Sequence, residues 1–357
     1  MNNHELPFKQ WIACTIAFSI LFFGIVVLFN YCCSLRTIST TTTLLEKAAQ
    51  KLLQGNPIAG LGDDKAYDDR LFQKILIQQM TSVPDMIVIG SSRSMMLRKK
   101  NMTLPASTNF FNHFLASASF EDAIAIIGMY EELQSALPKT IIFGIDPWVF
   151  NKKSFSEKWK SVGKYYLNLL RRIDYPVPYN NVNAPFDYTR LITLKYTMHN
   201  ITTLGTTPLS FYVPTTFALD EFIRDVDGSV HMPLKIRNQS QEETMKIINE
   251  SLEKNAYQRE TFDALANVSL FEACIKHLQK ESIVVFFLCP YHPKVYHFLS
   301  QKKSSSIMTV ETYLRHFALH NNIQVIGSYD PNSYDLTTED FFDGYHGHDS
   351  LVRKMLN

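Results

Sequence analysis

Nineteen consecutive residues near the amino terminus, Trp11–Phe29, carry no charge, and only Thr15 and Ser19 among them are mildly polar. Since a helix rises about 1.5 Å per residue, this run is about long enough to cross the ~30 Å hydrocarbon core of a bilayer. A cleaved signal peptide would have a shorter apolar region and a small-x-small cleavage site, whereas Asn-Tyr-Cys-Cys follows at 30–33. We therefore predict an uncleaved transmembrane anchor within residues 1–35, with a cleaved signal or a buried core helix as alternatives.

The charges that flank this run say little about its orientation. Lys9 precedes it, and Arg36, Lys47 and Lys51 follow it. The excess of basic residues that usually marks the cytoplasmic side is therefore almost absent, and it does not indicate the orientation of the helix.

The roughly 300 residues that follow are enough for one large α/β domain. A chain with 46% hydrophobic and 19% charged residues has the composition of a folded globular protein. Its 35 basic and 34 acidic side chains give no electrostatic case for nucleic acid. Only Cys274 and Cys289 lie outside the amino-terminal segment. Two buried free thiols are expected, with a disulfide between them as the alternative, and neither a metal site nor a cofactor is indicated.

Short, continuous apolar runs recur along this part of the chain and alternate with helical patterns. Strands that are apolar on both faces are typical of a parallel sheet covered by helices on both sides. The sequence therefore predicts an α/β fold, a three-layer α/β/α sandwich with a mainly parallel sheet of about five strands, preceded by one transmembrane helix. The predicted strands are 85–89, 141–145, 283–288 and 323–326, and the predicted crossover helices are 120–133, 261–279 and 309–319.

The predicted organisation has three parts. Residues 36–82 form a stalk and leading helices, with an amphipathic helix within 36–55 that Gly55 ends and a second helix at about 68–80. Residues 83–357 form the α/β domain. Within it, residues 152–257 are rich in Tyr, Asn and Pro, carry a turn signal at 227–229, and are predicted to be an insertion near the carboxyl ends of the strands.

The first strong strand leads into Gly90-Ser91-Ser92-Arg93-Ser94. Ligands of open α/β sheets bind beyond the carboxyl ends of the strands, and a serine there can use nearby backbone N–H groups to stabilise negative charge. Taken alone the motif is weak, because any of the three serines can simply cap the following helix.

A second motif, Asp340 to His346, follows the last predicted strand. A serine nucleophile needs a base, and a histidine base needs a partner that fixes its tautomer. The spacing of Asp343 and His346 lets both side chains approach one serine. We therefore predict a catalytic triad of Ser92, His346 and Asp343, with His348 as a competing base.

These two motifs resemble those of the SGNH (GDSL-like) hydrolases. Segment 90–92 is similar to their first block, usually Gly-Asp-Ser, with Ser92 in the nucleophile's place, and segment 343–346 is similar to their last block, Asp-x-x-His. The closer likeness is to a membrane-anchored branch with Gly-Ser-Ser, which includes the D-alanyl transfer protein of teichoic acid modification and the SGNH-like proteins of alginate O-acetylation. Segments 111–122 and 143–147 also look like this branch, so that the likeness covers most of residues 83–150 and 280–357.

The resemblance implies a serine esterase or O-acyltransferase that acts on acylated glycans or other esters of the cell envelope. It also implies a single-pass membrane protein whose large domain is extracytoplasmic, in the periplasm or at the cell surface, and a multi-pass membrane acyltransferase as a partner. The alternative is a catalytically impaired SGNH-like domain that binds glycans or partner proteins in an envelope assembly.

The alternative arises because this chain departs from the family at the oxyanion hole. The family's donors are a second-block glycine and a third-block asparagine, whereas this chain offers Ser117 and Asp146. A carboxylate near a developing oxyanion is repulsive unless it is protonated or turned away. Other residues predicted to contact substrate or the oxyanion are Ser91, Arg93 and His292, where a helix cap, a surface ion pair and a structural turn are the respective alternatives.

Overall fold

The computed structural model describes residues 5–62, 67–154, 156–177, 188–203, 209–302 and 306–356. The chain divides into two compact units. One comprises Met1–Leu45 with Ala184–Ser210, and the other comprises Glu46–Asn183 with Phe211–Asn357. The predicted domain boundaries and the predicted insertion at 152–257 stay predictions.

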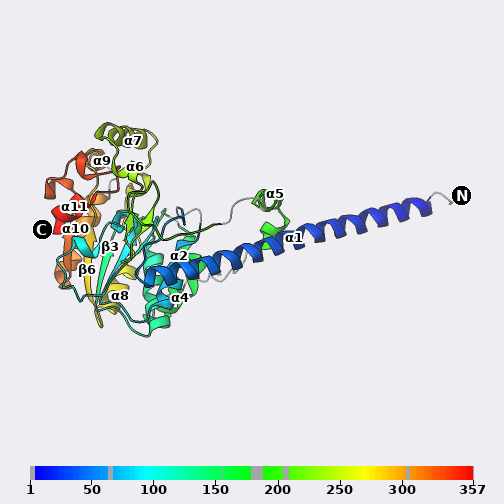
Figure 1. Ribbon diagram of the computed structural model, residues 1–357, viewed down its shortest axis with the longest axis horizontal. Coiled ribbons are helices and arrows are strands. Elements are labelled where there is room, and N and C mark those ends of the chain that lie inside the picture. The colour runs from blue at the N-terminus through cyan, green and yellow to red at the C-terminus, as the bar shows by residue number, and fades with distance from the viewer. Residues whose placement is uncertain are drawn as a thin grey trace. The chain divides into compact units, whose positions relative to one another are not determined.

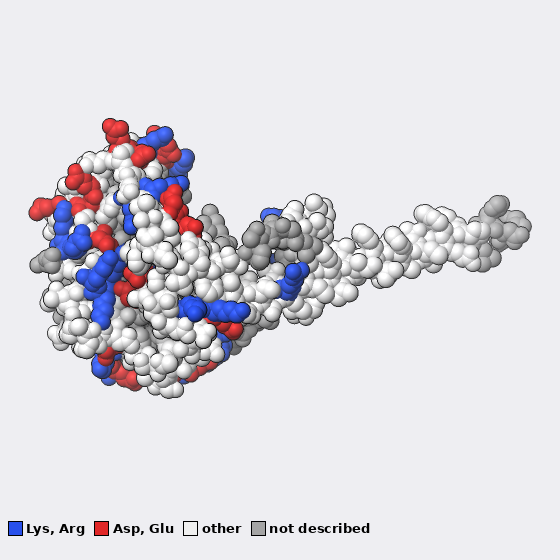
Figure 2. All heavy atoms as spheres, viewed as in Figure 1, with Lys and Arg blue, Asp and Glu red and all other residues white. Residues whose placement is uncertain are grey.

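The first unit is built on the amino-terminal part of helix α1, Glu5–Leu53 (Figure 1). Within the described chain, this is the one helix that is long and apolar enough to cross a membrane. Its apolar part presents an uncharged surface in the view of Figure 2. The 3-10 turn η6, Tyr188–Ile192, and helix α5, Leu194–Thr203, complete this unit.

The prediction that a separate helix starts after residue 36 is wrong, because α1 continues without a break to Leu53. The threonine-rich stretch is helical, and one of its hydroxyls bonds within the helix: Oγ1 of Thr40 donates to the carbonyl oxygens of Arg36 (2.9 Å) and Thr37 (3.1 Å). Gly55 ends the helix as predicted, with a φ of +85°.

The second unit contains the predicted α/β fold. Five strands form one parallel sheet in the order β2-β1-β3-β6-β7. This confirms the predicted fold class. The apolar runs predicted four of these five strands and missed one. The strands are β1 Met86–Ser91, β2 Phe110–Leu115, β3 Thr140–Gly144, β6 Ile283–Leu288 and β7 Gln324–Gly327.

Helices α2, α3, α8 and α10 cover one face of the sheet. Gln73 of α2 hydrogen-bonds His113 of β2 (2.7 Å), and the rings of Phe271 and Phe317, from α8 and α10, pack against Phe286 of β6. The helix predicted at 261–279 begins only at Val268, because the preceding Asn267 has a left-handed φ of +59°. The bounds are α2 Asp69–Gln79, α3 Phe120–Met129, α8 Val268–Leu278 and α10 Ile307–His320.

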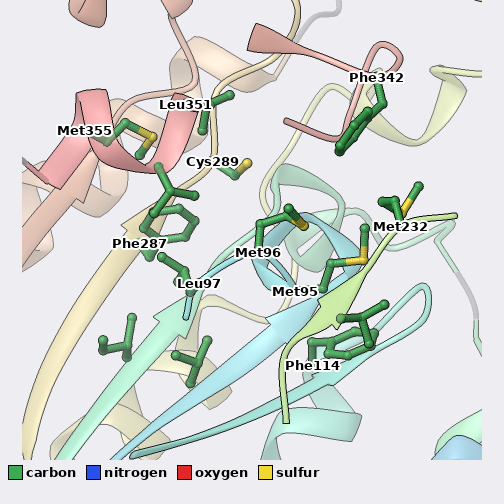
Figure 3. Packing of buried hydrophobic residues seen from close by; sticks show 14 of the residues in the cluster. Met95, Met96, Leu97, Phe114, Met232, Phe287, Cys289, Phe342, Leu351 and Met355 are labelled. Carbon is green, nitrogen blue, oxygen red and sulfur yellow. The ribbon is translucent and has the colours of Figure 1, made fainter. Parts of the chain in front are cut away.

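The other face packs against the segment that follows β1 and against the carboxyl-terminal helix α11, Asp349–Leu356. Figure 3 shows Met95, Met96 and Leu97 between the strands and residues of the last part of the chain, such as Phe342 and Leu351. Methionine fills irregular gaps well, which suits a layer where a turn, a loop and a helix meet. The same layer therefore brings the end of the chain over the exit of β1.

Residues 152–257 include a short antiparallel hairpin of β4, Ile223–Arg224, and β5, Val230–His231. The predicted turn at 227–229 joins them, and Gly228 there has a φ of +81°. The backbone N–H of Val230 donates to the carbonyl of Met95 (3.2 Å), so the hairpin lies against the turn after β1. The remaining elements of this unit are η1 Ser92–Ser94, η2 Lys99–Asn101, η3 Tyr130–Gln134, η4 Pro147–Phe150, η5 Lys158–Val162, α4 Gly163–Arg172, α6 Leu234–Arg237, α7 Gln241–Glu253, η7 Gln258–Glu260, α9 Pro293–Ser300, η8 Pro331–Tyr334 and η9 Thr338–Asp340.

Candidate active site

Ser92 begins the 3-10 turn η1 at the carboxyl end of β1. Gly90 permits this tight exit, because a Cβ there would lie 2.6 Å from Oγ of Ser94 and 3.0 Å from the backbone of Gly144. The two neighbouring serines have structural bonds: Oγ of Ser91 accepts from the N–H of Arg93 (3.2 Å), and Oγ of Ser94 donates to the carbonyl of Ser91 (2.8 Å). The capping role considered for these serines thus falls to Ser91, and Ser94 is bonded within the turn.

The loop that carries Asp343 and His346 is closed by backbone bonds. An antiparallel bridge joins Phe341 to Gly347, and the N–H of Phe342 donates to the carbonyl of His346 (2.8 Å). The loop also packs closely against its surroundings, since a Cβ on Gly344 would clash with the hydroxyl of Tyr257. A small number of backbone contacts therefore fixes the loop without regular secondary structure.

Ser92, His346 and Asp343 form a continuous chain of hydrogen bonds. Nε2 of His346 lies 2.9 Å from Oγ of Ser92, and Nδ1 of His346 lies 2.8 Å from Oδ2 of Asp343. Oδ1 of Asp343 accepts from the backbone N–H groups of Tyr345 (2.7 Å) and His346 (2.8 Å). Because an ionised carboxylate only accepts, the proton of the neutral imidazole belongs on Nδ1, which leaves Nε2 free to accept from the serine hydroxyl.

The electrostatics of the pair favour an ionised carboxylate. Burial alone would raise the pKa of Asp343, but the charge of His346 and the hydrogen bonds from His346 and Tyr345 lower it below its usual value. Burial alone would lower the pKa of His346, but the charge and hydrogen bond of Asp343 outweigh it and the pKa is raised. Asp343 thus stabilises the imidazolium that would form when His346 takes a proton.

Ser92 and His346 line a cavity of about 270 Å³. Two charged residues, Asp69 and Arg224, also line it. Its apolar wall is formed by Ile58, Leu61, Met95, Phe114, Phe222, Val230 and Met232.

Arg224 comes from strand β4 and was missed at the sequence level, because it lies in residues 152–257, which the likeness to known proteins does not cover. Its guanidinium is centred 4.6 Å from the ring of Phe114, and its Nη1 donates to the carbonyl of Gly228 (3.1 Å). The cavity therefore joins an apolar wall to a cation that packs on an aromatic face.

Ser117 lines the same cavity and has a left-handed φ of +53°. The N–H of Ala116 donates to Asp69 (2.9 Å) and that of Ala118 to the carbonyl of Leu115 (3.3 Å). The N–H of Ser117, between them, has no partner among the residues that the structure describes. It is thus available as a donor at the position predicted for the oxyanion hole.

A buried ion-pair network holds the loop of Ser117 in place. Nε and Nη2 of Arg70 each donate to Asp122 at 2.9 Å, and Nη1 of Arg70 donates to Asp69 at 2.5 Å. Asp122 in turn accepts from the N–H of Ser119 (2.8 Å). Both ends of the loop are therefore tied to the start of α2.

Ser117→Gly is expected to retain both stability and reactivity, because glycine adopts a positive φ without steric cost. Ser117→Val should lower the free energy of unfolding by ~1–2 kcal/mol, since a β-branched residue is strained there. Thermal unfolding, together with the rate at which an ester-like probe labels Ser92, would measure both effects. Equal behaviour of the two variants would mean that the left-handed backbone does not constrain this position.

Arg93 and Asp146 are placed behind the triad and do not line the cavity. Nη1 of Arg93 lies 3.1 Å from Oδ1 of Asp146, Nη2 donates to the carbonyls of Cys289 and Pro290, and the guanidinium stacks 3.9 Å from the ring centre of Tyr291. Arg93 is only 5% exposed and Asp146 4%, so neither a surface ion pair nor a substrate contact describes them. The carboxylate of Asp146 is turned towards Arg93, which removes the repulsion expected near an oxyanion.

His292 and His348 also lie apart from the proton-transfer chain. Nδ1 of His292 accepts from the N–H of Lys294 (3.1 Å), its Nε2 lies 3.1 Å from Oγ1 of Thr338, and burial lowers its pKa to about 4. A neutral helix cap is therefore its role. The ring of His348 packs on that of Phe342, with centroids 3.8 Å apart. Ser92 is hydrogen-bonded to His346 and not to His348.

Glu260 is a buried acid near this cluster that sequence reasoning missed. It is fully buried, its Oε1 accepts from the hydroxyl of Tyr291 (3.4 Å), and its Oε2 has no partner among the described residues. Burial raises its pKa to about 7. No local motif marks this position, because the acid meets Tyr291 only through the fold.

Glu260→Gln should stabilise the protein above neutral pH. An acid with a raised folded pKa contributes stability below its unfolded value of about 4.5 and loses it as the pH rises through about 7. The variant should therefore be more stable than the parent by ~3 kcal/mol at pH ~8 and little changed at pH ~5. Urea unfolding at both pH values measures this, with the exposed Glu253→Gln as control. A difference that does not depend on pH would contradict the raised pKa.

Among the described residues, no group of three or more His, Cys, Asp or Glu side chains is arranged to hold a metal ion. Comparison with known proteins adds no assignment: no family model, no curated protein and no solved structure matches this chain. The site is therefore interpreted from its own geometry.

Proposed function

We propose that this chain is a membrane-anchored, SGNH-like serine esterase or O-acyltransferase that acts on acylated glycans or related esters of the cell envelope. The observation that carries the proposal is the hydrogen-bonded chain from Ser92 through His346 to Asp343, with distances of 2.9 and 2.8 Å. Ser92 and His346 are 254 positions apart in the sequence, so their hydrogen bond is not a local turn or capping contact. Hydroxyl, imidazole and carboxylate in this order are the arrangement that activates a serine.

The chemistry follows from the positions of the atoms. Oγ of Ser92 attacks the acyl carbonyl carbon while Nε2 of His346 takes the hydroxyl proton, which gives a tetrahedral oxyanion. The C–O bond to the alcohol breaks, His346 returns the proton to the leaving oxygen, and the acyl group remains on Ser92. Water or a sugar hydroxyl then attacks the acyl-enzyme with His346 again as base, which gives hydrolysis or transfer.

The cavity supplies places for the other parts of the reaction. Its apolar wall suits an acyl group, because burial of methylene groups is favourable. The N–H of Ser117, which lines the same cavity as Ser92, is the candidate donor to the oxyanion, and stabilisation of this kind is often the largest contribution to acyl transfer.

The proposal also includes the membrane. Helix α1 has the length and composition of a span, and the resemblance favours an extracytoplasmic domain and a multi-pass membrane acyltransferase as partner. An anchored enzyme would act on polymers or lipids close to the bilayer.

A fluorophosphonate probe on the purified chain tests the catalytic part. The parent should be labelled covalently, and Ser92→Ala should lose the label. Ser94→Ala is the matched control, because this hydroxyl lies in the same turn but is bonded to the carbonyl of Ser91. Labelling that persists in Ser92→Ala would remove Ser92 as the nucleophile.

One observation favours a second candidate, a domain that binds glycan or partner proteins without catalysis. Asp146 stands where the family has an oxyanion donor, and its carboxylate is engaged with Arg93. Absence of both probe labelling and p-nitrophenyl acetate turnover in the folded parent would favour this candidate.

A further inference from the structure

Helix α5 is attached to α1 by a set of polar contacts within the first unit. Nδ2 of Asn30 donates to the carbonyl of Leu191 (2.7 Å) and to Oγ1 of Thr197 (2.8 Å), and its Oδ1 accepts from Asn200 (2.9 Å). Asn30 is fully buried. An amide whose donors and acceptor are satisfied in this way fixes the position of one helix on the other.

A second contact lies one turn further along α1. Oγ of Ser34 is 2.6 Å from the hydroxyl of Tyr196, and Ser34 is 4% exposed. The attachment therefore uses one face of α5, formed by Tyr196, Thr197 and Asn200.

The rest of α5 divides into two further faces. Leu194, Met198 and Ile201 follow the spacing of one helical stripe and are 77%, 51% and 51% exposed. The polar residues Lys195, His199 and Thr202 form a separate stripe, also exposed. By helical periodicity the attached, apolar and polar faces point in three different directions.

The attachment point sets the depth of α5 relative to the apolar run. Asn30 follows directly after Phe29, the last residue of that run, and Ser34 lies about 7 Å beyond it along the helix axis. The interfacial layer on each side of a bilayer is roughly 5–7 Å thick. The exposed Leu28 (61%) and Tyr31 (39%) of α1 belong to the same level.

We propose that α5 is an interfacial helix whose stripe of Leu194, Met198 and Ile201 inserts at the boundary of headgroups and acyl chains of the bilayer that α1 crosses. The inference rests on the anchoring part of the proposed function and not on its chemistry. Lipid is the occupant because the exposed apolar stripe is held, through Asn30, at the level of α1 where the uncharged run and therefore the bilayer would end. Lys195, on the adjacent polar face, is placed to meet headgroups.

Depth-dependent fluorescence quenching tests the inference on the full chain in phosphatidylcholine vesicles. Cys14, Cys32 and Cys33 are replaced by serine, and an environment-sensitive NBD probe is attached to Met198→Cys. The lipids carry a doxyl quencher either near the headgroup or near the chain end. The probe should be quenched roughly twofold more strongly by the shallow quencher, as expected for a helix in the interface.

Three further probes complete the design. Leu194→Cys repeats the measurement on the same stripe, Lys195→Cys is the matched control on the polar face, and Ile20→Cys reports whether α1 itself is in the bilayer. The Lys195 probe should stay accessible to water, and the Ile20 probe should be quenched most by the deep quencher.

The outcomes separate this inference from the anchor. If the Ile20 probe is in lipid but the probes on the stripe are as accessible to water as the probe at Lys195, the interfacial helix is overturned and the anchor remains. An Ile20 probe in water would overturn both. If the stripe probes are shielded from water but neither doxyl-labelled lipid quenches them, protein, such as a second copy of this chain, covers the stripe. This result would also overturn the interfacial helix.

Discussion

Asp343→Asn is expected to lower the rate of covalent labelling of Ser92 by about 10⁴-fold while the protein stays folded. The carboxylate accepts from Nδ1 of His346 at 2.8 Å and from two backbone N–H groups. An amide can keep one or two of these contacts, but its NH₂ group favours the tautomer with the proton on Nε2. Nε2 could then no longer accept the proton of Ser92. The measurement is the pseudo-first-order rate of fluorophosphonate labelling.

The pH profile distinguishes this loss from a general distortion. The charge of Asp343 raises the pKa of His346 against the effect of burial. The parent's labelling rate should therefore rise with pH through a pKa above the usual histidine value, and the residual rate of the variant should show a lower one. Asp335→Asn is the matched control, because Asp335 is exposed and has a left-handed φ of +49° that asparagine tolerates. Equal rates for Asp343→Asn and the parent would exclude the triad.

Most of the sheet could be predicted from sequence because four of its five strands are short apolar runs that carry their own signal, whereas β2 is interrupted by Asn112 and His113. The meeting of Ser92 with His346 could be anticipated for a related reason. A parallel sheet collects the carboxyl ends of its strands at one edge, and both motifs follow strands. The competition among the three serines of the first motif was decided only by the fold, since backbone geometry assigns Ser91 and Ser94 to local hydrogen bonds.

The contacts of the buried charged side chains around the site could not be predicted from local sequence patterns. The sequence predicts Arg93 as a substrate contact or a surface ion pair, but its partners Asp146, Cys289 and Tyr291 come from the ends of two other strands. Glu260 and Arg224 likewise gain their surroundings from distant segments. Burial of a charged side chain depends on tertiary contacts that leave no periodic pattern in the sequence.

Arg93→Met should destabilise the protein by ~3–5 kcal/mol, because it leaves the carboxylate of Asp146 buried without its cation. Burial raises the pKa of Asp146, and the charge of Arg93 acts against the rise. The side chain also donates to the carbonyls of Cys289 and Pro290 at the end of β6. In the variant, these two carbonyl groups would also lose their hydrogen-bond donor. Chemical denaturation of the detergent-solubilised chain, followed by intrinsic fluorescence, measures the loss.

The double variant Arg93→Met, Asp146→Asn separates the charge from the packing. If the unpaired carboxylate causes most of the loss, the double variant should recover a large part of it, since a neutral amide is far less costly to bury than a charge. Arg171→Met, an exposed arginine of α4, should leave the unfolding midpoint unchanged. Because Arg93 directly follows Ser92, the single variant should also slow labelling of the serine, and the double variant should restore it in parallel with stability. Full stability of Arg93→Met would show that Asp146 is neutral in the folded protein and that the pair does not hold the nucleophile's turn.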